Sequence, residues 1–560
     1  MTSTPSTPST PSTPSTPSTA STPAPRAGRK EWIGLAVLVL PCLLTSMDMS
    51  VLLFGLPFIS ASLKPSATQQ LWIMDAYGFA LAGLLITMGA IGDRIGRRRL
   101  LLIGATAFGA ASVVAAYSGS AEVLIGTRAL LGVAGATLMP STMALIRTMF
   151  HDPKQRQTAI SLWTGGLIGG VTLGPIVGGV LLNHFWWGSV FLINLPAMAL
   201  LLVLGPMLLP EYKAPVSGHR FDVLGSVLSM AAVFPAVYGI KQLAVDGFSV
   251  TAAGALAFGL ALAIAFVVRQ HTAKNPLIDM ELFRKPGFRA PMLVNLSGNF
   301  VLMGFSLFNT QYLQSVAGMR PFTAALWSMG AMPFISVGMG VTGALTAKVR
   351  PGRIIGVAFL ASAAGALVLT LAHPGNPIVV LMIGAGVAAG GVVAAQSIVG
   401  NMVMAAAPAE RAGSASALNE TGAELGSSLG MALLGSIGAA IYHHKMAAVG
   451  AAGVPDAAVR AGHETVGGAD AVAAQFPGAA SHALLSTARD AYASGLHTAA
   501  AVGAVLLALT ALFAFRALRN EPVLPAAPKK EKAKQGGKAE LVEPSPGYAA
   551  TSVSAVWAHE

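Results

Sequence analysis

The stretch Gly89-Ala90-Ile91-Gly92-Asp93-Arg94-Ile95-Gly96-Arg97-Arg98-Arg99-Leu100 decides how this chain folds. It is a short charged turn between two long apolar runs, 69–92 and 100–118. Five of its charges fall within seven residues, in a chain of which only 10% is charged. Charges this dense do not sit in hydrocarbon, so we predict a loop, and its four arginines place that loop on the cytoplasmic side of a membrane. The three glycines at 89, 92 and 96 allow a sharp turn and a close approach of two helices.

The composition of the whole chain indicates a polytopic helical membrane protein. Of its 560 residues 54% are hydrophobic, and the mean hydropathy is +0.66. A soluble protein of this length needs more charge to cover its surface. The formal charge of +12 comes from basic residues in short loops, which favours a positive-inside topology over nucleic-acid binding. The single cysteine, Cys42, excludes an internal disulfide and a cysteine-based metal cluster.

Apolar runs long enough for a bilayer core of about 30 Å recur along the chain. We therefore expect an all-α fold with fourteen membrane spans, arranged as six, two and six. The predicted spans are 32–57, 69–92, 100–118, 121–149, 156–182, 187–209, 222–243, 249–269, 288–316, 322–347, 353–372, 377–405, 411–441 and 494–518. Alternate loops and both chain ends are rich in Lys and Arg, so both termini are expected in the cytoplasm. The sequence GALTAKVRPGR at 343–353 weakly repeats the opening stretch, which supports two similar halves with a substrate site between them.

We divide the chain into five parts on this basis. The predicted parts are a disordered Ser/Thr/Pro cytoplasmic tail (1–30), a first six-helix bundle (31–210), two inserted spans with linkers (211–287), a second six-helix bundle (288–518) and a basic disordered cytoplasmic tail (519–560). The second bundle includes an extracytoplasmic loop at 443–493, whose alanine-rich pieces suggest a small helical hairpin. Residues 1–25 are polar, so no cleavable signal peptide is expected.

Ionisable residues inside membrane spans are costly, so each is a functional hypothesis. Those singled out here are Asp48, Asp75, Arg128, Glu420 and Glu424. Asp48 lies midway along the first span, between two methionines. Desolvation there favours the protonated acid unless a cation is bound, which is the competition that a proton-coupled cation exporter needs. The alternative is an acid that a neighbouring helix satisfies.

The other four residues also carry two interpretations each. Asp75, beside Trp72, is either a cation-binding acid or part of an interfacial aromatic anchor. Glu420 and Glu424 are four residues apart and share a helix face, so they carry protons or bind a cation, unless the span begins later and water surrounds both. Arg128 either assists proton release from a partner acid or forms a structural ion pair.

A second glycine-rich stretch, Gly170-Val171-Thr172-Leu173-Gly174-Pro175-Ile176-Val177-Gly178-Gly179, lies inside the fifth predicted span. Packing alone explains its glycines, but Pro175 removes a backbone hydrogen bond between them and favours a conformational pivot. The sequence contains no phosphate-binding Gly-x-x-x-x-Gly-Lys-Ser/Thr loop, so ATP is not expected to drive the protein. We interpret His443 and His444 as a surface pair rather than a metal site, and we expect no enzyme activity, no cofactor and no metal.

These stretches resemble the major facilitator superfamily, and within it the fourteen-span drug:proton antiporter-2 family. Gly89–Leu100 resembles the superfamily's cytoplasmic loop motif, and Gly170–Gly179 resembles its antiporter motif. Arg128–Gly132 resembles the fourth-span motif, although Leu131 stands where many members carry Gln. Met47–Pro57 together with Thr68–Tyr77 most resembles the quaternary-ammonium exporters of the QacA and SmvA type. The resemblance covers residues 30–520.

The resemblance implies proton-driven efflux of lipophilic cations: quaternary ammonium antiseptics, intercalating dyes and viologens. It implies protonatable acids at Asp48, Asp75 and Glu420. It also implies that Asp93, with Arg97 and Arg98 as companions, locks the inner ends of the two halves together in the outward-open state.

Several alternatives to drug export remain open. The main one is a dedicated exporter of one endogenous metabolite, for example an antibiotic made by the same cell; a membrane sensor or a passive channel is less favoured. In either exporter interpretation we expect a monomer in the inner or plasma membrane. Its partners would be lipid, protons and small cationic amphipathic substrates, with no nucleic acid.

Overall fold

The computed structural model describes residues 26–211, 222–245, 247–273, 280–375, 377–406, 412–450, 454–476 and 478–523. All regular elements in these ranges are helices. Most of both predicted tails, residues 1–25 and 524–560, lies outside them.

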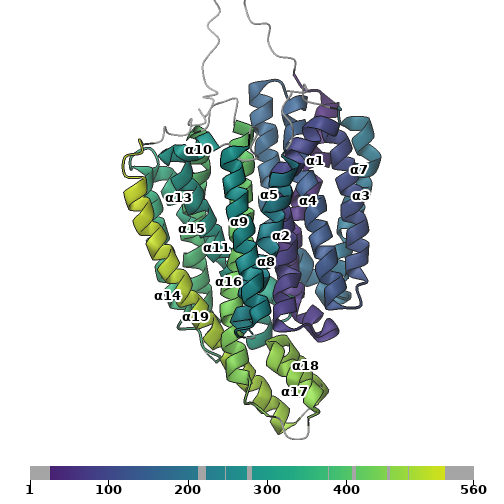
Figure 1. Ribbon diagram of the computed structural model, residues 1–560, viewed down its shortest axis with the longest axis vertical. Coiled ribbons are helices and arrows are strands. Elements are labelled where there is room, and N and C mark those ends of the chain that lie inside the picture. The colour runs from purple at the N-terminus through teal and green to yellow at the C-terminus, as the bar shows by residue number, and fades with distance from the viewer. Residues whose placement is uncertain are drawn as a thin grey trace, which may run out of the picture. The chain divides into compact units, whose positions relative to one another are not determined.

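The first bundle consists of long helices packed side by side (Figure 1). It contains α1 (Arg29–Leu63), α2 (Ala67–Ile95), α3 (Arg97–Ala116), α4 (Ala121–Met149), α5 (Pro153–His184), the short α6 (Ser189–Leu192) and α7 (Asn194–Leu208). Side-chain caps define several starts: Ser66, Ser120 and Asp152 each accept a hydrogen bond from a backbone N–H in the first turn of α2, α4 or α5. α1 packs along α5, whereas α2 and α3 pack along α4.

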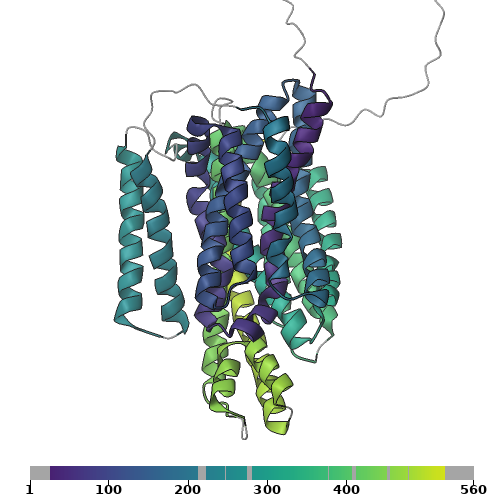
Figure 2. The same ribbon diagram turned by 90° about the vertical axis from the view of Figure 1, so that its right-hand side faces the viewer.

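Two inserted helices, α8 (Val223–Val245) and α9 (Val250–Thr272), follow as a hairpin at one edge of the molecule (Figure 2). α8 also contacts α2 of the first bundle and α16 of the second. α9 keeps large apolar side chains exposed, among them Phe258 and Ile264, as a lipid-facing helix does.

The second bundle repeats the helical arrangement with more interruptions. It contains α10 (Met280–Arg284), α11 (Pro286–Gln311), a π-helical turn η1 (Tyr312–Val316), α12 (Pro321–Ser328), a 3₁₀ turn η2 (Met329–Ala331), α13 (Met332–Leu345), α14 (Pro351–Leu369), α15 (Ile378–Ala406), α16 (Ala412–Met446), α17 (Asp456–Glu464), α18 (Val466–Gln475) and α19 (Ala479–Ala517). α11 packs on α16, and α14 packs between α15 and α19.

Thirteen helical segments in the described ranges are long and apolar enough to cross a membrane. α8 adds a shorter apolar stretch, Val227–Leu243, where the seventh span was predicted. The all-α, multi-pass fold is thus confirmed, and the count of fourteen stays a prediction. One boundary differs clearly: α19 begins at Ala479 instead of residue 494. Its first turns are polar, and hydropathy detects only the part of a helix that lies in hydrocarbon.

The predicted outward loop 443–493 is mostly helical. α16 extends to Met446, and α17 and α18 pack against each other at the end of the molecule opposite the start of α1 (Figure 1). Glu464 at the end of α17 accepts a hydrogen bond of 3.0 Å from the backbone N–H of Ala67, the first residue of α2. α18 packs on α1. The hairpin therefore joins the second half of the chain to the end of α1 and the start of α2.

Candidate transport site within the membrane

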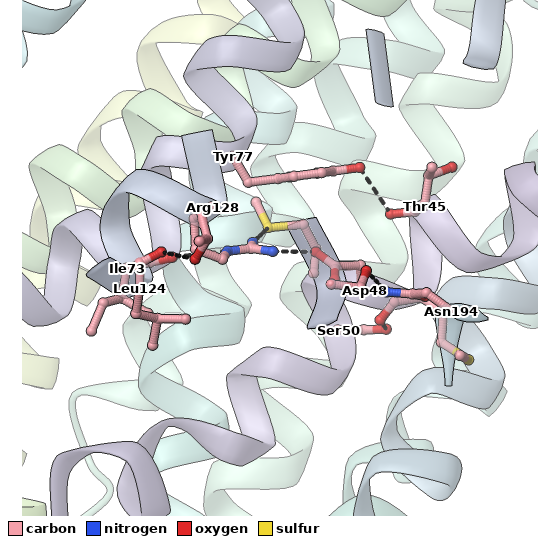
Figure 3. Close-up of polar contacts among 12 residues, drawn as sticks. Thr45, Asp48, Ser50, Ile73, Tyr77, Leu124, Arg128 and Asn194 are labelled. Carbon is pink, nitrogen blue, oxygen red and sulfur yellow. Dashed lines mark hydrogen bonds and ion pairs between the residues drawn. The ribbon is translucent and has the colours of Figure 1, made fainter. Parts of the chain in front are cut away.

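The first predicted acid, Asp48 of α1, forms a buried ion pair with Arg128 of α4. The carboxylate oxygen Oδ2 contacts Nη1 of the guanidinium, and the two side chains are 2% and 0% exposed. Figure 3 shows Arg128 lying between Asp48 and the backbone carbonyl of Ile73 on α2. Arg128 Nε donates to that carbonyl at 3.1 Å, and its guanidinium carbon lies 4.7 Å from the centre of the Tyr77 ring. Two contacts with α2 therefore hold the arginine independently of its acidic partner.

In this ion pair each buried charge is balanced by the other. A buried pair adds little net stability, because desolvation offsets the attraction between the charges. Removing one partner, however, leaves the other uncompensated, at a cost of about 3–5 kcal/mol. Protonation of Asp48 would remove the negative member in the same way, while the arginine stays charged. The contact of α1 with α4 at this point therefore depends on the charge of both members of the pair.

The second predicted acid, Asp75 of α2, also forms an ion pair. Its partner, Lys241, was not among the residues predicted from the sequence. Lys241 Nζ of α8 lies 2.7 Å from Asp75 Oδ2, and both side chains are fully buried. The interpretation of Asp75 as a wetted acid beside an interfacial aromatic anchor is therefore wrong. A signal for Lys241 was present, because it falls inside the predicted span 222–243 and belonged among the intramembrane charges.

Glu420 and Glu424 of α16 differ from the first two acids, because neither has a hydrogen bond or ion pair with another described residue. Both side chains are only partly buried, and both lie within the candidate span Ala415–Met446. One turn beyond Glu424, Ser428 packs against Gly78 of α2, where an added Cβ would lie 2.1 Å from its Oγ. The two glutamates thus lie on the helix that packs along α2, at the contact between the two halves.

The glycines of the second predicted motif hold α5 tightly against α1. A Cβ added at Gly170 would lie 2.2 Å from the backbone oxygen of Leu43, and one at Gly174 would lie 2.0 Å from Ser50 Oγ. Pro175 lies inside α5, which continues to His184. At the outer end of the same helix, a Cβ at Gly179 would lie 2.7 Å from the Cα of Phe322 on α12. Gly179 is therefore a contact between the two halves.

We expect Gly170→Ala to destabilise the protein by about 1–3 kcal/mol, since the new methyl group would collide with the backbone of α1. Gly169→Ala is the matched control, because nothing lies within 4 Å of a Cβ at that position. Thermal unfolding of the two purified variants in one detergent measures the difference. Equal midpoints would contradict the tight contact between α1 and α5.

Three arginines of the charged loop 93–99 pair with Asp93 or Glu211. Asp93 pairs with Arg97 at 2.6 Å, whereas Arg98 lies 3.5 Å from Glu211 and donates to the backbone carbonyl of Leu209. Gly96 has a φ of +112°, a conformation that requires glycine at this turn. Arg97 thus accompanies Asp93 as expected, and Arg98 does not. The predicted lock between halves belongs to the outward-open state and stays a prediction.

Comparison with known proteins identifies the family. Residues 38–431 match the sequence profile of the Major Facilitator Superfamily. The chain belongs to the major facilitator superfamily. This membership makes it a multi-pass membrane transporter and not an enzyme. It confirms the resemblance stated above at the superfamily level, while the fourteen-span family and the quaternary-ammonium subgroup stay predictions.

Individual superfamily members extend the similarity over most of the chain. Multidrug efflux pump LfrA of Mycolicibacterium smegmatis is 42% identical over 86% of this chain and 95% of its own length. Methyl viologen resistance protein SmvA of Salmonella typhimurium is 34% identical over 72% of this chain and 82% of its own length. Among solved structures, a bacterial homolog of the human lysosomal transporter Spinster, crystallised inward-facing and unoccupied, superposes with a TM-score of 0.61. The two chains are 19% identical, and the match covers 88% of this chain and 98% of the Spinster homolog. At this identity the match supports the fold alone.

In this major facilitator protein the predicted site residues form three groups. Asp48 and Arg128 meet as a pair within the first half, and Asp75 meets Lys241 of the inserted hairpin. Glu420 and Glu424 lie in the second half, on the helix that packs along α2. Of the four acids, the two glutamates are thus the ones on a helix of the second half that packs on the first.

Proposed function

We propose that this protein exports lipophilic organic cations from the cytoplasm across the plasma membrane in exchange for protons. The observation that carries the proposal is the pair of partly buried glutamates on α16, which have no basic partner among the described residues. Unpaired acids within a span are costly, and a proton or an organic cation relieves that cost. Competition between the two is the physical basis of antiport.

The buried pairs provide the second requirement, a coupling of charge to helix packing. When the site faces outwards, a proton at Asp48 would loosen α1 from Arg128 and release the cation. When the site faces inwards, loss of the proton restores the pair with Arg128 and leaves the glutamates free to bind the next cation. Each proton contributes about 1.4 kcal/mol per pH unit. Each net charge moved adds about 2.3 kcal/mol per 100 mV, so an exchange of one proton for one monovalent cation is insensitive to voltage.

The relatives support this choice of substrate. The two most similar proteins described above carry names that refer to multidrug efflux and to methyl viologen resistance. The tetracenomycin C resistance and export protein of Streptomyces glaucescens is 31% identical over 74% of this chain, and it supports the alternative of a dedicated metabolite exporter. The transport assay below separates the two. For export, we place both termini and the charged loop 93–99 on the cytoplasmic side.

The test is transport by the purified protein in liposomes under an imposed pH gradient, with tetraphenylphosphonium and ethidium as substrates. Wild-type protein is expected to drive both cations against their gradients, and nigericin should abolish that transport. The substitution Glu424→Gln is expected to lower the initial rate at least about tenfold, because it removes an acid that binds cation or proton. Glu122→Gln, at an exposed position at the start of α4, is the control and should leave the rate unchanged. If the wild-type protein transports neither cation, the proposal is refuted and the metabolite exporter is favoured.

A further inference from the structure

The contact between α2 and the inserted helix α8 contains a group that the transport cycle above does not use. Lys241 Nζ lies 2.7 Å from Asp75 Oδ2 and 4.2 Å from the centre of the Trp72 ring. The Trp72 ring stacks on Phe234, with centres 5.9 Å apart and planes at 10°. Phe79 packs edge-on against both rings. The ammonium group thus lies between a carboxylate and the face of Trp72, and Phe234 and Phe79 pack on that tryptophan. We call Asp75 and these three rings the cage.

This cage has the chemistry that recognises organic cations. A cation over the face of a tryptophan is attracted by the ring's quadrupole, and desolvation strengthens that attraction. Aromatic cages of this kind bind quaternary ammonium groups, which cannot donate hydrogen bonds. A buried carboxylate supplies the balancing charge. An ammonium with three donors is a poorer match for such a cage than a cation with none.

Two contacts hold the ammonium of Lys241, one with the Asp75 carboxylate and one with the face of Trp72. Asp75 is its only ion-pair partner among the described residues. Arg128, by contrast, also donates a hydrogen bond to the backbone carbonyl of Ile73. The lysine stem is flexible, and beside Trp72 a cavity opens that is lined by Gln69, Gln242 and Glu464. This polar cavity shares Trp72 with the cage.

The position of α8 gives such a displacement a consequence. α8 packs on both α2 and α16, one helix from each half, so it spans the contact along which the halves move. Its attachment to α2 includes the ion pair, whereas its contacts with α16 are apolar and involve Leu425, Leu429 and Ala432. Release of Lys241 would weaken the attachment of the inserted hairpin to the first half, leaving the Trp72–Phe234 stack and the Ser229–Gly83 hydrogen bond.

We infer that Lys241 is a built-in ligand of this cage, and that the cage of Asp75, Trp72, Phe79 and Phe234 binds lipophilic monovalent organic cations in its place. Lys241 is then a specificity-determining residue: only a cation that outcompetes a tethered ammonium occupies the cage. This inference rests on the proposed function for its substrate class. It assigns the inserted hairpin a part in substrate recognition.

Equilibrium binding of tetraphenylphosphonium to purified protein tests the inference. Lys241→Met removes the tethered competitor and leaves Asp75 without a counter-charge, so the affinity should rise about tenfold or more. The double variant Asp75→Asn/Lys241→Met should lose that gain. Lys241→Arg keeps a cation in the cage and should stay near the wild-type affinity. Arg269→Met is the matched control, since it breaks the other ion pair of the hairpin, with Asp222, and should not change the affinity.

If Lys241 has only a structural role, we expect a different result. Lys241→Met would then lower the unfolding midpoint while the affinity stays equal or falls, which would overturn the inference. If Lys241→Met does not fold, the inference is tested instead by acetylating the wild-type protein with acetic anhydride. Saturating tetraphenylphosphonium should raise labelling of Lys241 several-fold, and unchanged labelling would overturn the inference. The binding assay needs no pH gradient, so the two proposals can fail separately. If the protein does not couple cation transport to protons, the proposed function is refuted. If it does, but the binding changes above do not occur, only the role of Lys241 is refuted.

Discussion

Asp48→Asn is expected to reduce proton-driven cation efflux to the background rate of empty liposomes. The amide has nearly the same size as the acid, but it neither takes up a proton nor balances the charge of Arg128. Arg128 should keep its position, because the Ile73 carbonyl and the Tyr77 ring hold it independently of Asp48. The loss would therefore reflect charge rather than a collapsed site. Tetraphenylphosphonium transport under an imposed pH gradient measures it.

The control for Asp48→Asn must separate lost coupling from lost stability. The single variant leaves a buried arginine without its partner, at a cost of about 3–5 kcal/mol of unfolding free energy. The double variant Asp48→Asn/Arg128→Gln removes both charges and should recover much of that stability without recovering transport. If Asp48→Asn still performs gradient-dependent efflux, Asp48 is not the coupling acid. Asp75, Glu420 or Glu424 would then take that role.

A disulfide between Ser60→Cys and Gly467→Cys should stop transport completely and reversibly. Ser60 lies near the outer end of α1, and Gly467 lies in α18 of the outer hairpin. A Cβ at Gly467 would lie 3.4 Å from the Cβ of Ser60, close to the spacing of a disulfide. Alternating access requires the outer ends of the two halves to separate, and the bond would prevent this. Efflux should fall to the leak rate after oxidation and return after dithiothreitol.

Each single cysteine variant serves as a control for the cross-link and should transport normally under both conditions. The native Cys42 is fully buried and contacts Thr142, so it should not compete for the new thiols. A gel shift after cleavage between the two positions verifies that the bond has formed. Transport at the normal rate by fully cross-linked protein would show that the hairpin and α1 move together and that the outer opening lies elsewhere.

Local features of the sequence were sufficient to predict the membrane fold. Apolar runs have the length of a span, and charge density marks loops such as 93–99, because both properties depend only on neighbouring residues. The same reasoning singled out Asp48 and Arg128, since a charge within an apolar run is conspicuous by itself. Glu420 and Glu424 were found by their spacing on one helix face.

Only the tertiary structure decided which charges meet. Asp75 and Lys241 come from α2 and α8, which are far apart in the chain, and apolar helices carry no surface pattern that tells which neighbours they will have. The same holds for Glu464, whose contact with the start of α2 depends on how the outer hairpin packs. Hydropathy is a property of each segment, whereas pairing depends on close packing between segments. The sequence by itself therefore determined the spans and most of the acids, and packing determined their partners.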